Sequence, residues 1–415
     1  MEENINVLIS GAGIAGPVAA YWLRRAGFNP TVVERAPAPR PGGQTVDLRG
    51  ADRTVIERMS LLGRMRALSL EQKGFAYVDK RGRITARMPA DAFGGKGIVS
   101  DIELLRGDLC RAFYEASLSR TEYLFNDSIT RIEQDDSGVT VEFEKAKSRR
   151  FALVVGADGL HSTVRRLAFA AESDCLQPFD LYTSWFTAAL DIDLDGWFLM
   201  YNAPGGLVAS ARPGRGTDET KAGLSFRAPA LMYERASRLA QEEVLRKRFA
   251  GAGWEVDRPL AAMSQAIDFY FDSVGQVHLE RWARNRVVLL GDAGYCPSPL
   301  PGLGTSLAIV GAYILAGELS AADGDHRVAF PHYEERMRPY VSEAQKIPPG
   351  GVNGYAPMSA LMVRMRALSM RWMTRWPVRL LAADLFTKAD AIDLPLYQSL
   401  DLSPTASSVP AFDSA

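Results

Sequence analysis

The strongest constraint on the fold of this chain lies near its N-terminus. Residues 5–10, INVLIS, form an apolar run of the kind that parallel sheets bury on both faces. The glycine-rich stretch GAGIAG follows, and then come an apolar-periodic helix, PVAAYWLRRAG, and a second strand, PTVVER. A strand–turn–helix–strand unit with Gly11, Gly13 and Gly16 in G-x-G-x-x-G spacing predicts an α/β, Rossmann-like domain.

The glycine turn has the chemistry of a dinucleotide site. Gly11 permits the tight turn, Gly13 lets a backbone approach a pyrophosphate, and Gly16 lets the helix pack on the strand. The helix N-terminus then faces the anion. Glu34 ends the second strand, where an acid binds an adenosine ribose hydroxyl and disfavours a 2′-phosphate. The turn therefore predicts NAD or FAD as the bound nucleotide in preference to NADP.

Length and composition narrow the class of protein. A chain of 415 residues predicts two joined domains, and a formal net charge of −1 provides no field that would attract nucleic acid. Cys110, Cys175 and Cys296 are odd in number and far apart, which argues against disulfides and zinc and fits a reducing cytoplasm. The four histidines lack ligand spacing, so no metal site is expected.

No targeting or spanning segment is apparent in the sequence. The acidic N-terminus, MEENINV, is unlike a signal peptide. The longest apolar run, 306–316, is short of the roughly 20 residues that span a bilayer, so it predicts a buried helix. These features predict a cytoplasmic protein without stable membrane insertion.

The strand pattern changes along the chain. From about 178 to 275, alternating segments such as YTSWFTAALDI and AGLSFRA predict an antiparallel sheet, and near 286 the buried type of strand returns in RVVLLGDAG. Earlier, 101–117 predicts one helix, and SITRIEQDDSGVTVEFE predicts a hairpin. The predicted boundaries are 1–177 for the first part of the nucleotide domain, 178–275 for the inserted sheet domain, 276–350 for the return, 351–400 for a C-terminal helical segment and 401–415 for a frayed tail.

Two later glycine turns favour FAD over NAD. VVGADGLHSTVR places Asp158 after one strand, and VVLLGDAGYCPSPLPGLGTSLA places Asp292 after another, with Gly302-Leu303-Gly304 opening a helix. In this ordered set the sequence resembles the FAD-dependent aromatic hydroxylases, the single-component class A flavoprotein monooxygenases, over roughly residues 5–345. The resemblance implies a Rossmann-like FAD-binding domain with an inserted antiparallel-sheet substrate domain and a C-terminal helix.

The resemblance also implies residue roles. Asp292 would bind the ribityl chain, and the amides from Gly302 to Ser306 would stabilise negative charge on the flavin ring. Arg106 and Asp158 match family residues near the cofactor; the simpler interpretations are a surface arginine and a helix-capping aspartate. Gly294-Tyr295 and Leu303 depart from the common family pattern. The expected cofactor-binding set is Gly11, Gly13, Ala15, Gly16, Glu34, Arg35, Gln44, Arg106, Asp158, Gly291, Asp292, Pro299, Gly302, Gly304, Thr305 and Ser306.

The implied reaction consumes NADH or NADPH. The reductant reduces FAD, and O2 then forms a C4a-hydroperoxide that passes one oxygen atom to the substrate. Only one dinucleotide fingerprint occurs, so the reductant is expected to bind transiently. No side chain is identified as a catalytic acid or base, because the cofactor carries the chemistry.

The substrate class follows from a narrower resemblance. The loop GGQTVDLRG, the turn after Asp292 and the C-terminal helical segment look most like the tetracycline-inactivating flavin monooxygenases and related polyketide hydroxylases. A bulky polycyclic aromatic substrate is therefore implied. Leu361, Met365, Leu368 and Trp372 share one helical face, which fits a cavity wall, a docking helix or a membrane surface. The candidate substrate-binding residues are Gln44, Arg49, Arg212, Phe226, Pro299 and Trp372.

Other functions remain open from the sequence. A flavin-dependent halogenase would carry W-x-W-x-I-P, which WMTRWP does not match. An isoprenoid-chain reductase and a non-enzymatic flavin-binding sensor are further alternatives. No heptad or exposed hydrophobic helix demands a dimer, so a monomer is expected.

Overall fold

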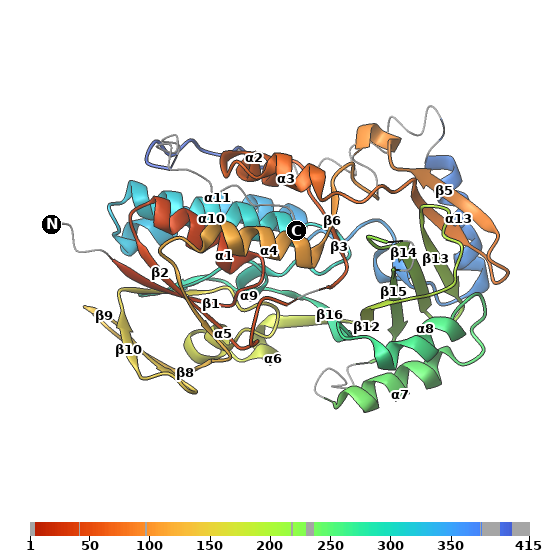
Figure 1. Ribbon diagram of the computed structural model, residues 1–415, viewed down its shortest axis with the longest axis horizontal. Helices are drawn as coiled ribbons and strands as arrows, with labels where there is room; N and C mark the ends of the chain where they lie inside the picture. Colours follow the sequence, from red (N-terminus) through yellow and green to blue (C-terminus); the bar gives the residue numbers. More distant parts are fainter. Residues whose placement is uncertain are drawn as a thin grey trace, which may run out of the picture.

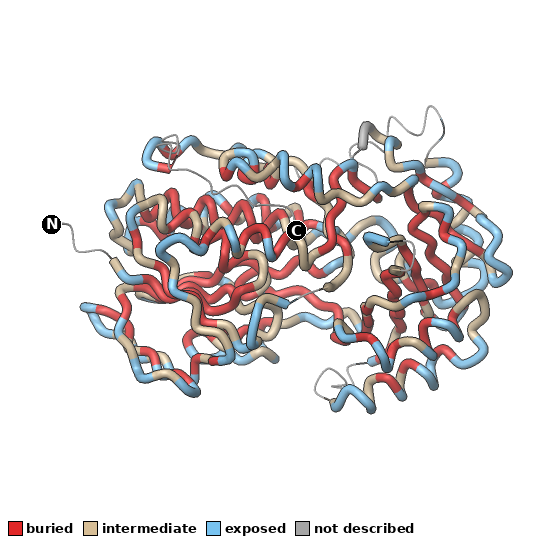
Figure 2. Tube along the Cα trace, viewed as in Figure 1, coloured by how far each residue is buried: buried red, intermediate tan, exposed pale blue. Residues whose placement is uncertain are grey.

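The computed structural model describes residues 5–40, 42–95, 98–216, 219–229, 236–373, 375 and 391–400. Two halves lie side by side, one on a mainly parallel sheet and one on a mainly antiparallel sheet (Figure 1). Buried residues concentrate in the two sheets and in the helix faces that cover them (Figure 2). The predicted fold class is confirmed.

The first half, here called the cofactor half, contains the predicted strand–turn–helix–strand unit. β1 pairs in parallel with β2 and with β11, so the N-terminal strand lies at the centre of the sheet. Parallel strands buried on both faces explain the continuous apolar runs in the sequence. The strand order is β17 (Ala283–Arg284), β18 (Val287–Leu289), β11 (Leu153–Gly156), β1 (Asn6–Ser10), β2 (Asn29–Glu34) and β7 (Glu122–Phe125).

Helices cover this sheet, and α10 is surrounded by other helices. α10 packs on α1, α2 and α11, and 78% of it is buried, although by length and composition it could cross a membrane. The predicted buried helix is confirmed. The helices of this half are α1 (Ala15–Arg25), α2 (Ala51–Arg58), α3 (Leu62–Ala67), α4 (Arg106–Ser117), α5 (Thr163–Ala168), α6 (Glu172–Cys175), α9 (Asp292–Tyr295), α10 (Gly304–Ala321) and α11 (His326–Ala344).

Two small sheets complete this half. β8 (Ile129–Asp135) and β9 (Gly138–Phe143) form the predicted hairpin, and β10 (Arg149–Phe151) pairs with β9. The prediction of one helix over 101–117 is wrong at its start. β6 (Glu103–Leu105) pairs with β3 (Thr45–Asp47), and its three residues are buried. The helix therefore begins only at Arg106, with α4.

The second half, here called the sheet half, is built on seven strands. The predicted antiparallel sheet is present, but it also takes in β4 and β5, whose residues the sequence assigned to the first domain. β4 joins through a parallel pairing with β13, which no local pattern announces. The order is β16 (Tyr270–Val277), β12 (Leu176–Ala188), β15 (Thr220–Arg227), β14 (Leu207–Pro213), β13 (Trp197–Ala203), β4 (Gly74–Val78) and β5 (Ile84–Pro89).

The two faces of this sheet have different covers. α7 (Arg238–Phe249) and α8 (Asp257–Ala262) bury one face in a hydrophobic cluster that includes Phe226. α12 (Gly351–Tyr355) and α13 (Ala360–Met373) pack on the other face, in a cluster that includes Phe198. α13 runs along β5 at the outer edge of the molecule (Figure 1).

The end of the described chain returns to the cofactor half. The ring of Tyr397 packs so closely on α10 that a Cβ at Gly317 would lie 2.1 Å from it, and Arg25 donates two hydrogen bonds to the Leu400 carbonyl. The predicted helical segment 351–400 is therefore helical only in its first part, among the described residues. The predicted frayed tail lies outside the described residues.

Candidate functional site

The glycine turn between β1 and α1 leaves no room for side chains. Gly11 has φ +101°, and a Cβ there would lie 2.5 Å from the Ala157 carbonyl oxygen. A Cβ on Gly16 would lie 1.9 Å from the Gly11 carbonyl oxygen. At Gly13 the same test finds only a guanidinium nitrogen of Arg106, 3.5 Å away. The turn is thus packed against the protein at its first and third glycines and open at its second, as an approaching pyrophosphate requires.

Glu34 faces this turn from the end of β2. Its carboxylate accepts hydrogen bonds from the amides of Ala12, at 2.8 Å, and Ala36, at 2.9 Å. Each carboxylate oxygen has a second lone pair, so the group can still accept from ribose hydroxyls. Arg35 is exposed beside it, and Ala15 is buried at the start of α1.

Arg106 connects this turn to the loop before β3, which contains Gly42 and Gly43. Its amide donates to the Gln44 carbonyl oxygen at 3.0 Å, and its side chain runs between Gly13 and Gly43. A guanidinium in this place adds positive charge to the amides of the turn, which suits a phosphate ligand. The predicted residues Gly13, Gln44 and Arg106 are thus brought together.

Asp292 lies at the start of α9, where the Arg106 guanidinium acts on its carboxyl. Burial raises the pKa of its carboxyl, while the Cys296 thiol and the Arg106 guanidinium lower it. A Cβ on Gly304 would lie 3.6 Å from its Oδ1 atom, so the carboxylate faces the N-terminus of α10. A carboxylate next to a helix N-terminus offers an acceptor for hydroxyls and a positive field for an anion.

The loop before α10 is open at one glycine and anchored at a serine. Gly291 has φ +64° and Gly302 has φ +71°, and nothing lies within 4 Å of a Cβ at Gly302. Pro299 is exposed and Thr305 is half-buried. The Ser306 hydroxyl donates to the carboxylate of Asp52, so this predicted residue serves to hold the start of α10.

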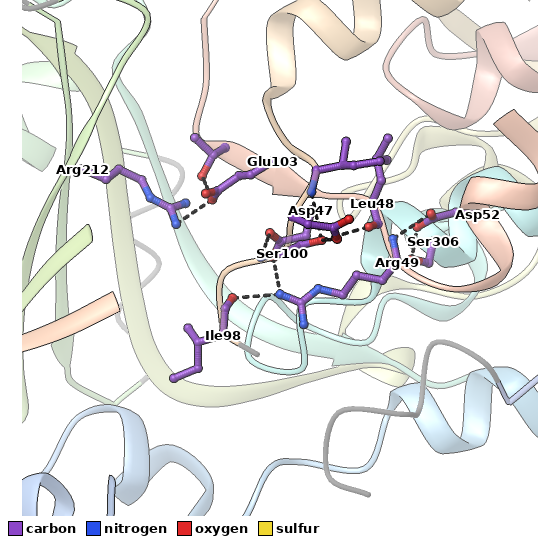
Figure 3. Close-up of polar contacts among 12 residues, drawn as sticks. Asp47, Leu48, Arg49, Asp52, Ile98, Ser100, Glu103, Arg212 and Ser306 are labelled. Carbon is purple, nitrogen blue, oxygen red and sulfur yellow. Dashed lines mark hydrogen bonds and ion pairs between the residues drawn. The ribbon is translucent and has the colours of Figure 1, made fainter. Parts of the chain in front are cut away.

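Asp52 is a buried acid that no sequence pattern indicated (Figure 3). Burial raises the pKa of its carboxyl to about 7, although the Ser306 hydroxyl and the Arg49 amide, at 2.8 Å, both bond to it. Its place in the first turn of α2 is typical of a solvated helix-terminal acid, so the local sequence gives no signal of burial.

Arg212 and Glu103 form a buried ion pair between the two halves (Figure 3). The Arg212 guanidinium lies 2.7 Å from Glu103 Oε1, which also accepts from the Thr45 hydroxyl at 2.7 Å. Burial raises the pKa of the Glu103 carboxyl, and the guanidinium opposes that shift. The same guanidinium lies 3.9 Å from the centroid of the Phe198 ring.

The Arg212–Glu103 pair can still form further hydrogen bonds. Among the described residues, neither Glu103 Oε2 nor Arg212 Nε has a partner, although both atoms are buried. Buried polar atoms without partners are costly, so such a pair suits a polar ligand or bound water. Because the sequence predicted one helix over 101–117, it did not indicate the β3–β6 pairing that buries Glu103.

Arg49 lies next to this pair in the same network. Its guanidinium donates to Asp47 Oδ2 and to the Ile98 carbonyl oxygen, both at 2.8 Å (Figure 3). It is half-buried and lies in the short connection between β3 and α2.

Asp158 has the capping role that the sequence left as an alternative. Its carboxylate accepts from the Ser162 hydroxyl and from the amides of Thr163, at 2.8 Å, and Val164, at 3.1 Å. Burial raises the pKa of this carboxyl, while these hydrogen bonds lower it. The carboxylate therefore orders the start of α5, and a cofactor role would be additional.

Phe226 and Trp372 lie away from Arg212. Phe226 is fully buried and stacks with Tyr182 on the α7 side of the sheet, whereas Arg212 faces the opposite side, since successive strand residues alternate. Trp372 is 54% exposed on the outer face of α13. Of the alternatives for this helix face, a cavity wall is not what the structure shows at Trp372, because α13 turns Met370 toward the sheet instead.

Comparisons with known proteins agree with this geometry. The FAD binding domain family matches residues 4–344. The chain is 42% identical to the uncharacterized protein Rv1260 of Mycobacterium tuberculosis, over 85% of this chain and 95% of that protein. It is 37% identical to a flavin-dependent monooxygenase of Legionella longbeachae, over 83% and 88% of the two chains. The crystal structure of tetracycline destructase Tet(51) is similar, with a TM-score of 0.80 and 34% identity, covering 96% of this chain and 100% of that chain.

Proposed function

Because this chain belongs to the FAD binding domain family and is an FAD-dependent monooxygenase of the aromatic hydroxylase type, we propose that it oxygenates a bulky polycyclic substrate. The proposed substrate is an aromatic or polyketide compound, with tetracyclines included, and the proposed reductant is NADH or NADPH. One oxygen atom of O2 enters the product. A cytoplasmic location and a monomeric state are part of the same proposal.

The residues around the glycine turn fit FAD. We assign the pyrophosphate to the turn at Gly13 with Arg106, the adenosine ribose to Glu34, and the ribityl chain to Asp292. The N-terminus of α10 would face the flavin ring. When bound, FAD supplies the electron transfer and the activation of O2.

The observation that carries the substrate proposal is the Arg212–Glu103 pair. It is buried, and it joins β6 of the cofactor half to β14 of the sheet half. Among the described residues, its Glu103 Oε2 and Arg212 Nε atoms have no hydrogen-bond partner, and the Phe198 ring lies beside the guanidinium. An aromatic ring beside a desolvated guanidinium suits a flat polycycle that carries oxygen substituents. Arg212 would orient this substrate, and Glu103 would hold the guanidinium in place.

The test follows reductant and substrate together. Purified, FAD-loaded protein is mixed in air with NADH or NADPH and a panel of polycyclic phenols and tetracyclines, and product masses are recorded. The proposal expects faster oxidation of the reductant with one class of polycycle and a product heavier by one oxygen atom.

A variant separates binding from folding. Arg212→Gln is expected to raise the KM for the substrate at least about tenfold while reductant oxidation without substrate is unchanged. A reductant that is oxidised with no modified polycycle in the panel would contradict the substrate class and leave the flavoenzyme. Unchanged KM in Arg212→Gln would contradict the role of the ion pair.

A further inference from the structure

The inner face of α13 fixes how the helix sits on the sheet half. The Arg366 guanidinium donates to Asn202 Oδ1 and to the Tyr355 carbonyl oxygen, both at 2.7 Å, and lies 4.4 Å from the centroid of the Tyr77 ring. Met370 is 3% exposed in the same contact. Because this face is held by buried contacts, the opposite face of α13 must point outward.

That outward face is apolar along its length. Leu361 is 67% exposed, Met365 60%, Leu368 53% and Trp372 54%. Their 4, 3, 4 spacing places them in one stripe, which we call the α13 stripe. Single exposed apolar residues are ordinary, but a continuous stripe of four large ones marks an interaction surface.

The surroundings of the α13 stripe are cationic. Between Ala356 and Arg375 the sequence contains four arginines and no aspartate or glutamate. Arg364, Arg371 and Arg375 are exposed beside the stripe, and the Arg371 guanidinium donates to the Thr85 carbonyl oxygen of β5. The turn of the β4–β5 hairpin, next to α13 in Figure 1, carries the exposed residues Arg81 and Arg83, and the carboxylate of Asp79 pairs with Arg83. The other two basic residues of the hairpin lie toward the opposite face of the sheet, because Lys80 packs against Gly253 and Arg87 lies over the Trp197 ring.

We propose that the α13 stripe docks onto the surface of an anionic lipid bilayer. An interfacial helix buries Leu, Met and Trp side chains at the boundary of the acyl chains while its arginines contact the headgroups. Each basic residue near an anionic surface adds to the attraction. α13 has 14 residues, too few to span the roughly 30 Å hydrocarbon core, so the contact is peripheral.

A second copy of this chain fits the stripe less well. A two-fold contact through α13 would set the same patch of both copies face to face. The arginines beside the stripe of one copy would then approach those of the other copy, and residues 356–375 contain no acid to offset them. Anionic headgroups supply that missing charge.

The inference is independent of the proposed substrate. It does have a geometric consequence, because the inner face of α13 and the Phe198 ring beside Arg212 belong to one hydrophobic cluster. A bilayer bound to the outer face of α13 would therefore be separated from Phe198 and Arg212 by this one helix.

The test measures binding of the full FAD-loaded protein to vesicles. Sedimentation with vesicles of phosphatidylcholine and phosphatidylglycerol is expected to remove the protein from solution, whereas phosphatidylcholine alone removes little. High salt is expected to release it. With brominated anionic lipid, part of the tryptophan fluorescence is expected to be quenched, and Trp372→Phe loses that part.

Matched variants assign the contact. Leu361→Ser combined with Leu368→Ser, and separately Arg364→Gln combined with Arg375→Gln, are expected to weaken binding about tenfold or more. Leu239→Ser is the control, because Leu239 is 77% exposed on α7, which covers the opposite face of the sheet. FAD content and reductant oxidation check that each variant is folded.

Three results would overturn the proposal. One is no difference between the two kinds of vesicle. Another is a loss in Leu239→Ser equal to that in the stripe variants. The third is a concentration-dependent dimer without vesicle binding that Leu361→Ser abolishes, which would assign the stripe to a second copy.

Discussion

The cofactor half and the sheet half differ in how far apart along the chain the residues lie that form each site. In the cofactor half, β1, its glycine turn, α1 and β2 lie within one short segment, and the backbone itself shapes the site. In the sheet half, β4 joins β13 across more than a hundred residues, and the site depends on an ion pair between Glu103 and Arg212. The comparison teaches that backbone geometry marks the cofactor site locally, whereas the substrate site arises only from long-range pairing.

The greatest loss of stability is expected at the glycine turn of the cofactor half. Gly16→Ala would force a methyl group to within 1.9 Å of the Gly11 carbonyl oxygen, so we expect a loss of about 4–5 kcal/mol in unfolding free energy, together with loss of FAD. Gly63→Ala is the control, since it lies within α3 with nothing within 4 Å, and it should gain up to about 1 kcal/mol. Denaturation and flavin absorbance measure both, and similar stabilities would contradict the shape of the turn.

The next largest loss of stability is expected at the ion pair between Glu103 and Arg212. Arg212→Met leaves the Glu103 carboxylate buried without its charge partner, which should cost about 3–4 kcal/mol of unfolding free energy at about pH 8. The cost should shrink toward about pH 5, because the pKa of Glu103 is already raised and protonation removes the unpaired charge.

Arg64→Met provides the contrast for the ion pair. Arg64 and Glu115 are 41% and 42% exposed, so this substitution should cost less than about 1 kcal/mol. If Arg212→Met lowered the free energy of unfolding as little as Arg64→Met does, the buried ion pair would not join the two halves.

A smaller effect concerns Asp52 inside the cofactor half. Its raised pKa of about 7 means that its protonated form is favoured by folding, so its stabilising contribution is complete below about pH 4 and is lost as the pH rises to about 7. The unfolding free energy of the native protein should therefore fall by about 3 kcal/mol more than that of Asp52→Asn between about pH 5 and pH 8. Ser306→Ala should move the midpoint of this fall upward, because it removes a hydrogen bond that lowers the pKa. Parallel pH profiles for native protein and Asp52→Asn would contradict the burial of this acid.

The smallest effect concerns a contact between the halves. His161 lies between Glu172 and Asp272, with nitrogen–oxygen distances of 2.9 Å to each, and these partners raise the pKa of its imidazole to about 9. Arg165 lies near Glu172, and the Tyr270 hydroxyl donates to Asp272. The stabilisation is complete below about pH 6.5 and is lost as the pH rises through about 9.

The measurement compares His161→Gln with the native protein at both ends of this range. Because the side chain of His161 is 32% exposed, the substitution should cost only about 1 kcal/mol at about pH 6 and less at about pH 10. A larger cost at the alkaline end would reverse the assigned charge state.

The cofactor turn was predictable because its evidence is local. The spacing of Gly11, Gly13 and Gly16, with Glu34 at the next strand end, has one common structural solution. The ordered turns at Asp158 and Asp292 then identified the family that the comparisons confirm. The roles of the individual residues stay predictions.

The site in the sheet half was less predictable for a physical reason. Alternation reveals that a strand has two faces but not which helices cover them, so Phe226 and Arg212 were grouped although they point to opposite sides. For α13, periodicity identified the apolar stripe correctly, but the buried contact of Arg366 turns that stripe outward. A basic residue at an inner helix position is not a signal that hydrophobic patterning detects.

The most direct test of the account traces the oxygen atom. FAD-loaded protein, NADPH and a tetracycline or another accepted polycycle are incubated under isotopically labelled dioxygen, and the product is analysed by mass spectrometry. The account predicts a product that carries one labelled oxygen atom, formed in step with reductant oxidation. A product whose new oxygen comes from water, or a protein that binds no flavin when FAD is added, would contradict it.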